Sequence, residues 1–346
     1  MNNGGVDTRR LRILLELHRR GSMRAVADEM DITTSTVSQQ VAALAKEVGA
    51  TLVEPDGRNV RLTPAGRRLA DHSVAILAAV DAARLDLDPG AEPAGTVRVS
   101  GFATAIRRSL LPLIADLQKT HPRVRVSVLE HEPVEQFALL AADDVDLALT
   151  YDFTLAPAIF DATLVAQPLF TVPWSLGVPA DAPDDADLTG RDWIVNSRNP
   201  TEQDVVRTVG SMGGFTPRFV HQADSLVLLQ DLIVAGLGVG LLPADRPPRP
   251  GVRLVRLNGP EVLMRAWAVA RRGREAWPPL ALLLSRLGAA TPHPGGAPPS
   301  PGGTTPHPGQ APPSPGGTTP HSGEGPPSPG GGTTPPRPGT ARHRPG

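Results

Sequence analysis

Residues 8–68 decide the fold of the first part of the chain, and two stretches carry the argument: GSMRAVADEMDITTSTVSQQV at residues 21–41 and TLVEPDGRNVRLTPAG at residues 51–66. Leucines recur at helical spacing before Gly21, which ends a first helix. Ser22 is placed to cap a second helix over residues 23–30, and Thr33 a third that runs to about Lys46. Two short helices joined by a tight turn predict a helix-turn-helix.

The third helix has one apolar face and one face of small polar side chains. Val37, Val41, Leu44 and Val48 form the apolar stripe, and the opposite face carries Thr34, Ser35, Ser38, Gln39 and Ala42. Small hydroxyl and amide groups suit the edges of bases in a DNA major groove. The alternative is a solvated amphipathic helix. The candidate DNA-binding residues on and around this helix are Ser22, Thr33, Thr34, Ser35, Thr36, Ser38 and Gln39.

A β-wing is predicted directly after these helices. Asp56-Gly57 is a hairpin-turn pair with apolar residues on both sides. Arg58 and Arg61 lie in or beside that turn, where they would face a phosphate backbone or a minor groove, and they complete the DNA-binding candidates. Thr63-Pro64 then offers a capping residue followed by proline at the first helical position. The wing favours DNA over a merely solvated helix.

The charge balance agrees with a DNA-binding segment. Residues 1–70 hold 11 Lys and Arg against 8 Asp and Glu, a net charge of +3, whereas the whole chain has a net charge of −1. This modest local excess fits phosphate contacts at chosen positions rather than a nonspecific coating protein.

The segment 64–88 is predicted to be one long helix with a dimerisation seam. Its apolar positions follow alternating offsets of four and three, a coiled-coil pattern in which Ser73 also falls: Leu69, Ile76, Val80, Ala83 and Leu87. The alternative is a helix packed only on its own domain. A hinge is expected at residues 89–95, where proline and glycine break the helix.

Together these motifs resemble the N-terminal domain of LysR-type transcriptional regulators, through the runs Gly21–Ala27, Ile32–Val41 and Val60–Gly66. The chain departs from the family at Thr34-Ser35, where the family usually has Gln-Pro, and at Gln39, where it often has Arg. The resemblance implies a DNA-binding domain over residues 1–63 and double-stranded DNA with two-fold related half-sites as partner. It also implies a homodimer or homotetramer, and contact with RNA polymerase is a further expectation.

Residues 96–288 alternate predicted strands and helices, which indicates an α/β domain with parallel strands and crossover helices. The layout resembles the bilobed effector domain of LysR-type regulators, which shares the fold of periplasmic solute-binding proteins. The closest local match is Ala235–Pro243, whose glycines precede a strand and so do not form a nucleotide loop. The predicted fold class is therefore α/β overall: a mainly α winged helix-turn-helix, a linker helix and a bilobed α/β domain.

A small-molecule effector is expected in the cleft between the two lobes. Ligands of open α/β sheets bind beyond the carboxyl ends of strands, so the candidates are residues at predicted strand ends. For His221 a turn role satisfied by backbone groups is the alternative. The candidate effector-binding residues are Thr104, Ala105, Thr150, Tyr151, Asn196, Ser197 and His221.

The sequence gives little support for catalysis. It has no cysteine, HExxH pair, GxSxG elbow or P-loop, and no cofactor or metal is expected. Asp143-Asp144-x-Asp146 lacks the other ligands of a calcium loop, so a solvated turn is the expectation there. Two alternatives to the regulator remain: a cytosolic small-molecule-binding protein or enzyme that uses the N-terminal domain for assembly, and a ligand-independent architectural DNA binder.

A Pro/Gly-rich tail is predicted over residues 289–346, where a segment beginning at Thr291 recurs from Thr305 and Thr319. Its composition cannot bury a core, so it is expected to be disordered, either a partner-binding spacer or a tolerated extension. The sequence shows neither a membrane-spanning run nor a signal peptide, and a cytoplasmic protein is expected.

Overall fold

The structure is a computed structural model that describes residues 5–57, 59–88, 90–183, 190–257 and 259–289. The predicted tail from residue 290 onward and Arg58 lie outside the described residues.

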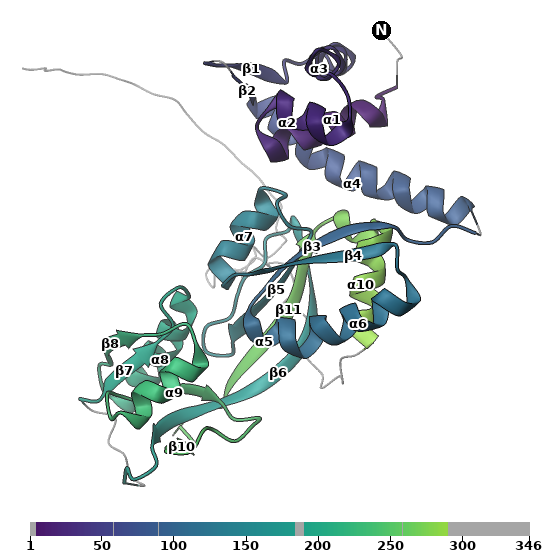
Figure 1. The fold of residues 1–346 in the computed structure, drawn as a ribbon. Helices are drawn as coiled ribbons and strands as arrows, with labels where there is room; N and C mark the ends of the chain where they lie inside the picture. Colours follow the sequence, from purple (N-terminus) through teal and green to yellow (C-terminus); the bar gives the residue numbers. More distant parts are fainter. Residues whose placement is uncertain (1–4, 58, 89, 184–189, 258, 290–346) are drawn as a thin grey trace, which may run out of the picture. The chain divides into compact units, whose positions relative to one another are not determined.

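The N-terminal segment forms the predicted helices, with boundaries set by local capping: α1 (Thr8–Arg20), α2 (Met23–Met30) and α3 (Thr34–Val48) (Figure 1). Gly21 ends α1 in the left-handed conformation, with φ of 64°. The side chains of Ser22 and Thr33 accept hydrogen bonds from the first turns of α2 and α3. The predicted helix-turn-helix is confirmed, and α3 runs slightly beyond the expected end at Lys46.

The wing and the long helix follow as predicted. Strands β1 (Val53–Asp56) and β2 (Asn59–Leu62) pair antiparallel, and Gly57 has a φ of 60° in the turn between them. Helix α4 (Pro64–Leu87) begins at Thr63, whose Oγ1 accepts a hydrogen bond from the Gly66 N–H at 3.0 Å. A Cβ atom at Gly66 would lie 2.1 Å from the Leu52 carbonyl oxygen, so only glycine allows this close approach.

A compact apolar core joins the helices, the wing and the start of α4. Leu14 of α1, Val37 and Val41 of α3, and Leu62 of the wing pack in one cluster with Val74 of α4. The spacing of these apolar residues therefore fixes which face of α3 is buried, and it leaves the opposite face free.

The rest of the described chain is an α/β domain. Its strands are β3 (Gly95–Gly101), β4 (Val124–Glu130), β5 (Leu147–Phe153), β6 (Leu164–Pro179), β7 (Asp192–Val195), β8 (Arg218–Gln222), β9 (Gly240–Pro243), β10 (Val252–Val255) and β11 (Val262–Arg271). Its helices are α5 (Ala103–Ala105), α6 (Leu111–Thr120), α7 (Pro133–Ala141), α8 (Pro200–Gly213), α9 (Leu226–Val234) and α10 (Pro278–Ala289), with a π-helical turn η1 (Ile106–Leu110) and a 3₁₀ turn η2 (Arg274–Ala276).

The larger sheet has the strand order β10-β6-β11-β5-β3-β4, and β9 also pairs with β6. The expectation of parallel strands was right only in part. Strand β3 is parallel to β4 and β5, and β7 is parallel to β8, but β11 runs antiparallel to both β5 and β6. Strands β9 and β10 are also antiparallel to β6. The reason is that β11 returns the chain along the path by which β6 left, so the two must run in opposite directions.

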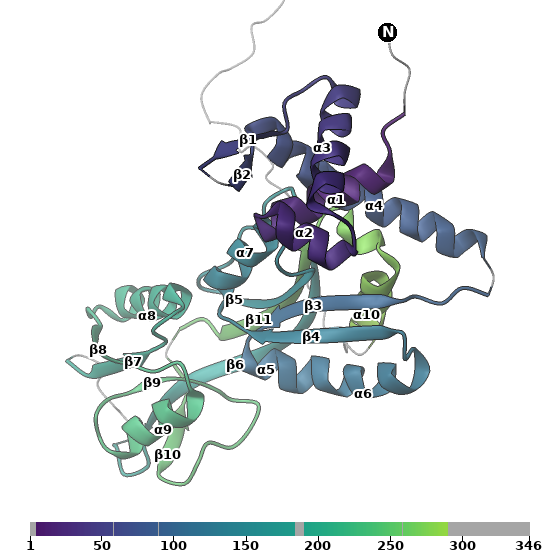
Figure 2. The same ribbon diagram turned by 45° about the horizontal axis from the view of Figure 1, so that its top comes forward.

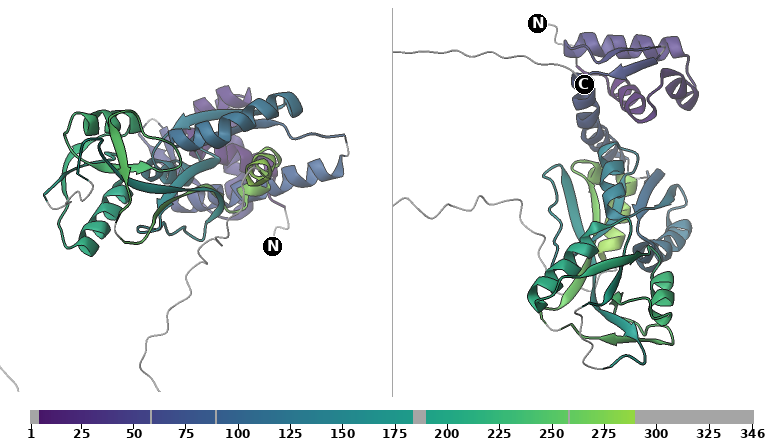
Figure 3. Two further views of the ribbon diagram at one scale, coloured as in Figure 1. Left: turned by 90° about the horizontal axis from the view of Figure 1, so that it is seen from below. Right: turned by 90° about the vertical axis from the view of Figure 1, so that its left-hand side faces the viewer.

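The long strand β6 joins two lobes. One lobe holds β3, β4 and β5 with α5, α6, α7 and α10, and the other holds β7, β8, α8 and α9 (Figures 1 and 2). Figure 3 shows the same division, with the green segments α8 and α9 gathered in the second lobe. Two lobes were predicted. Within the second lobe, the chain just before β9 passes close to β7, since a Cβ atom at Gly238 would lie 2.6 Å from the Asp192 carbonyl oxygen.

Candidate DNA-binding surface and effector cavity

The exposed face of α3 is a row of small polar side chains. Thr34, Ser35, Ser38 and Gln39 are exposed, while Val37 between them is fully buried. At the start of the helix Thr33 Oγ1 lies 2.8 Å from the hydroxyl oxygens of both Ser35 and Thr36, and it accepts a hydrogen bond from the Thr36 N–H at 3.1 Å. Capping thus orients the first-turn hydroxyls, whereas Ser38 and Gln39 one turn later have no described hydrogen-bond partner in the molecule.

The remaining DNA-binding candidates have more varied surroundings. Arg61 of the wing is exposed and pairs with Glu54 on the facing strand, with 3.0 Å between Nη2 and Oε1. Ser22 is half-buried and accepts a hydrogen bond from the Ala25 N–H at 3.5 Å, so its described role is to cap α2. Arg58 lies outside the described residues.

The predicted seam of α4 divides between exposed and buried positions. Ile76 and Leu87 are 42% and 82% exposed, Ala83 is exposed, and Leu69 and Val80 are half-buried. Ser73, which also falls on the seam pattern, is fully buried, and its hydroxyl donates to the Leu69 carbonyl. Ser73 therefore packs within its own domain and leaves a gap in the exposed seam pattern.

A cavity of about 290 Å³ lies between the lobes of the α/β domain. Three predicted effector-binding residues line it: Thr104 from α5, Tyr151 from β5 and Asn196 after β7. Apolar walls come from both lobes, through Phe102 and Leu229 among others. The strand ends therefore meet at one site, as expected for an open α/β sheet.

The other four effector-binding candidates do not line this cavity. Ala105 is fully buried in the main core, and Thr150 is 1% exposed on β5. Adjacent residues of a strand point to opposite faces, so with Tyr151 in the cavity Thr150 faces away from it. His221 lies on β8 in its pairing with β7. Ser197 is exposed, and its N–H and hydroxyl donate to Asp224, which does line the cavity.

Charged residues that were not among the predicted effector-binding residues also line the cavity. Its acidic side chains end or follow strands or lie at the starts of helices, and its arginines come from η1 and from the loops after β7 and β9. The sequence did hold a pattern that could have pointed to some of these residues. Glu132-Pro133 and Asn199-Pro200 each begin a helix just after a strand, and ligands of such sheets bind at that position. The added residues are Glu130, Glu132, Glu202, Asp224, Arg107, Arg198 and Arg246.

Burial perturbs the acidic groups of the cavity. Burial raises the pKa of Glu202 to about 8, although the Asn196 N–H donates to its Oε2 at 3.1 Å and opposes the rise. Burial also raises the pKa of Glu132, against the hydrogen bond that the Tyr151 hydroxyl donates to its Oε2 at 2.8 Å. The pKa of Tyr151 is raised well above its ordinary value by burial and by the nearby Glu132 charge.

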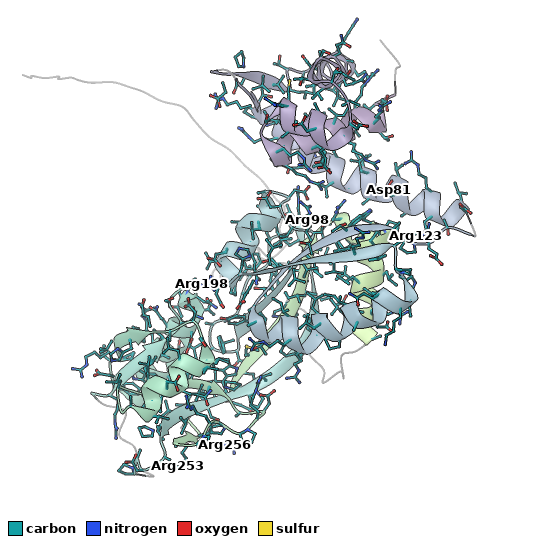
Figure 4. All side chains as sticks on the ribbon, in the orientation of Figure 1. Asp81, Arg98, Arg123, Arg198, Arg253 and Arg256 are labelled. Atoms are coloured by element: carbon teal, nitrogen blue, oxygen red, sulfur yellow. The ribbon has the colours of Figure 1, made fainter. Side chains whose placement is uncertain are left out.

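Ion pairs connect the lobes beside the cavity. Arg198, which follows β7, lies 3.5 Å from the Glu135 carboxylate on α7 and 3.1 Å from the Asp224 carboxylate (Figure 4). Arg108 on η1 donates to Asp245 after β9 at 2.8 Å. The Arg198–Glu135 and Arg108–Asp245 pairs each join a residue of one lobe to a residue of the other, whereas Arg198–Asp224 lies within the second lobe.

Two of the three acids between α7 and β5 are buried, so the expectation of a solvated turn was right only for Asp144, which is exposed. Asp143 and Asp146 are 0% and 1% exposed. Arg98 and Arg274 both donate to Asp146, at 2.9 Å and 2.7 Å for their closest contacts with Oδ1. Asp143 pairs with Arg19 and Arg271, so both buried acids are held in ion pairs with arginines. Within the described ranges no group of three or more His, Asp or Glu side chains could hold a metal ion.

A winged helix-turn-helix joined to a bilobed α/β domain with an internal cavity defines a DNA-binding regulator with a ligand-binding half. Comparison with known families agrees. Residues 8–67 match the bacterial regulatory helix-turn-helix proteins of the lysR family, and residues 90–291 match the LysR substrate binding domain. The chain therefore belongs to the LysR family of transcriptional regulators.

Individual relatives are also named as transcriptional regulators. The transcriptional dual regulator GltC of Bacillus subtilis is 27% identical over 286 residues, which cover 79% of this chain and 93% of GltC. The transcriptional regulator IlvR of Caulobacter vibrioides is 30% identical over 251 residues, which cover 68% of this chain and 83% of IlvR. Both are transcriptional regulators and not enzymes.

A solved structure shares the fold. Full-length OxyR from Pseudomonas aeruginosa, in a variant form, superposes with a TM-score of 0.63 at 19% sequence identity, covering 82% of this chain and 95% of that chain. In the described part of this chain, no helix has the length and apolar character needed to cross a membrane.

Proposed function

We propose that this regulator binds a two-fold related operator in a sequence-specific manner in the cytoplasm and is gated by a small molecule in the cavity between its lobes. The exposed face of α3 carries the proposal. Ser38 and Gln39 are exposed beside a buried Val37, on a helix whose start is fixed by the Thr33 cap. A rigid helix with free hydroxyl and amide groups suits base edges in a major groove.

Footprinting tests the DNA half of this proposal. Full-length protein on the DNA upstream of its own gene is expected to protect two half-sites related by a two-fold axis and separated by about one helical turn or a multiple of it. Protection of a single half-site, or of the whole fragment without boundaries, would contradict a sequence-specific two-fold reader.

The exposed apolar positions of α4 support a dimer. Ile76 and Leu87 are exposed apolar side chains on the same face of a long helix, and half-buried Val80 lies between them. Apolar residues at this spacing pack against a second copy in a coiled-coil seam. Two copies would present two α3 helices, which matches a two-fold operator.

Ile76→Asp is expected to dissociate this dimer. The two copies of α4 would then each place one carboxylate in the apolar interface, with no cation to pair with it. Sedimentation velocity at micromolar concentration should show the wild type as a dimer or larger and the variant as a monomer. Ile76→Leu keeps the apolar contact and should remain associated. An unchanged sedimentation coefficient for Ile76→Asp would place the interface elsewhere.

Gating requires that the ligand bind two arrangements of the protein with different affinity. The cavity is lined from both lobes, and the Arg198–Glu135 and Arg108–Asp245 ion pairs cross between them. A ligand in the cavity contacts both lobes at once, so its binding is expected to favour lobe closure and to change how the DNA-binding domains are held.

A further inference from the structure

The buried end of the cavity is acidic. Glu132 and Glu202 line the cavity and are only 9% and 5% exposed. The cationic side chains among its described lining residues, Arg107, Arg198 and Arg246, are all exposed. The two carboxyls therefore face the interior without a buried cation of the protein to balance them.

Glu202 has an unused hydrogen-bond acceptor. Its Oε2 accepts from the Asn196 N–H, but its buried Oε1 has no hydrogen-bond partner among the described residues. A buried acceptor left unpaired is energetically unfavourable. Glu132 lies close enough to Glu202 to affect its ionisation, and its own Oε2 is bound by the Tyr151 hydroxyl. A ligand N–H group at this end would satisfy the free oxygen.

We propose that the effector carries a protonated amine, which the carboxyls of Glu202 and Glu132 bind at the buried end of the cavity. This inference rests on the proposed function, since it names the ligand class of the same cavity. The bound cation is organic, because no described group of side chains has the ligands for a metal ion. The volume of about 290 Å³ fits a small metabolite.

The mouth of the cavity suits an anionic group at the other end of the ligand. Arg198 is already paired with Glu135 and Asp224, and Arg246 has a 3.4 Å contact with the neighbouring Asp245. Arg107 lines the cavity and forms no ion pair with any residue that the structure describes. An amino acid with its amine directed inward and its carboxylate directed toward Arg107 would match both ends.

Binding of such a ligand is coupled to proton release. The groups that face Glu202 around the cavity are acids and a phenol from the first lobe and the β8 loop, Glu130, Glu132, Asp224 and Tyr151, and the three arginines at the mouth. In the empty cavity Glu202 is mostly protonated at pH 7, since its pKa is about 8. An ammonium group stabilises the ionised carboxylate, so the complex forms with release of one proton from Glu202 to solvent. Affinity should therefore rise as pH rises toward about 8.

Calorimetry with ω-amino acids tests this inference on the full chain. A series that includes 6-aminohexanoate is titrated beside the matching diacids, such as hexanedioate, in buffers of different ionisation enthalpy. At least one amino acid is expected to bind with release of about one proton, and its affinity should rise about tenfold from pH 6 to pH 7. Proton uptake accompanying a bound diacid would show instead that protonated Glu202 donates to a carboxylate.

Glu202→Gln supplies the decisive variant. Glutamine has the shape of the protonated acid and can still accept from the Asn196 N–H, so the fold should be retained. The variant is expected to weaken amino-acid binding at least tenfold and to remove its pH dependence, whereas Glu261→Gln, an exposed acid outside the cavity, should change neither. Unaltered binding by Glu202→Gln, or no binding of any amine, overturns the inference. If a diacid binds, ligand gating survives; if no compound of either class binds, the gating proposal fails as well.

Discussion

Asp146→Ala is expected to lower the free energy of unfolding by about 3–5 kcal/mol, because it leaves two arginines beside a buried void without their shared counter-charge. The Asp146 carboxylate is 0% exposed in its ion pairs with Arg98 and Arg274. Arg274 is itself only 8% exposed, and its guanidinium carbon lies 4.2 Å from the centroid of the Trp277 ring. Urea denaturation of the full chain measures the loss.

A surface ion pair provides the matched control. Asp204 pairs with Arg207 one turn away on α8, and both side chains are more than half exposed. Asp204→Ala removes the same charge and is expected to change stability by less than about 1 kcal/mol. A similar small loss for Asp146→Ala would show that the buried cluster does not hold the domain together.

The same residue gives the stability a pH dependence. Burial raises the pKa of Asp146, but the hydrogen bonds and charges of Arg98 and Arg274 outweigh it and lower the pKa to about 2. The pKa in the unfolded chain is near 3.9, so the folded state favours the ionised form. This contribution, about 2–3 kcal/mol, is fully present above pH 4 and is lost as pH falls toward 2. Asp146→Asn should remove this part of the acid sensitivity.

Ser38→Glu is expected to weaken operator binding about 100-fold, roughly 3 kcal/mol, because it places a carboxylate in the middle of the face that meets DNA. Ser38 is exposed, and glutamate is a good helix former, so α3 should stay folded. Loss of a hydroxyl contact alone, in Ser38→Ala, should have a much smaller effect.

Met212→Glu controls for the added charge. Met212 is 56% exposed on α8, in the second lobe of the α/β domain. The substitution adds the same carboxylate to the same chain away from α3, and it should leave operator affinity within about twofold of the wild type. Equal losses from the two variants would indicate a nonspecific effect of net charge.

The helix-turn-helix could be predicted closely because its determinants are local. Ser22, Thr33 and Thr63 cap the helices that directly follow them, and each forms the expected side-chain hydrogen bond. The buried stripe of α3 follows from spacing within one helix. Nothing in these elements depends on which distant segment they pack against.

The sheet of the α/β domain was harder to predict, since strand direction depends on distant partners. Strand β11 pairs with β6, about a hundred residues earlier, and no local pattern marks that pairing as antiparallel. Every residue of β5 is buried, so the alternation that would separate Tyr151 from Thr150 is hidden. The acidic end of the cavity combines Glu132 and Glu202, which are far apart in sequence and come together only through the fold.

We propose that the exposed face of α3 contacts the bases of the operator, and a mobility-shift titration of the upstream intergenic fragment measures that contact. Wild-type protein and Met212→Glu are expected to retard the fragment at the same nanomolar-range concentration, whereas Ser38→Glu should require about 100-fold more protein. Failure of the wild type to retard any upstream fragment at low salt, or retardation by Ser38→Glu at the wild-type concentration, would contradict this proposal.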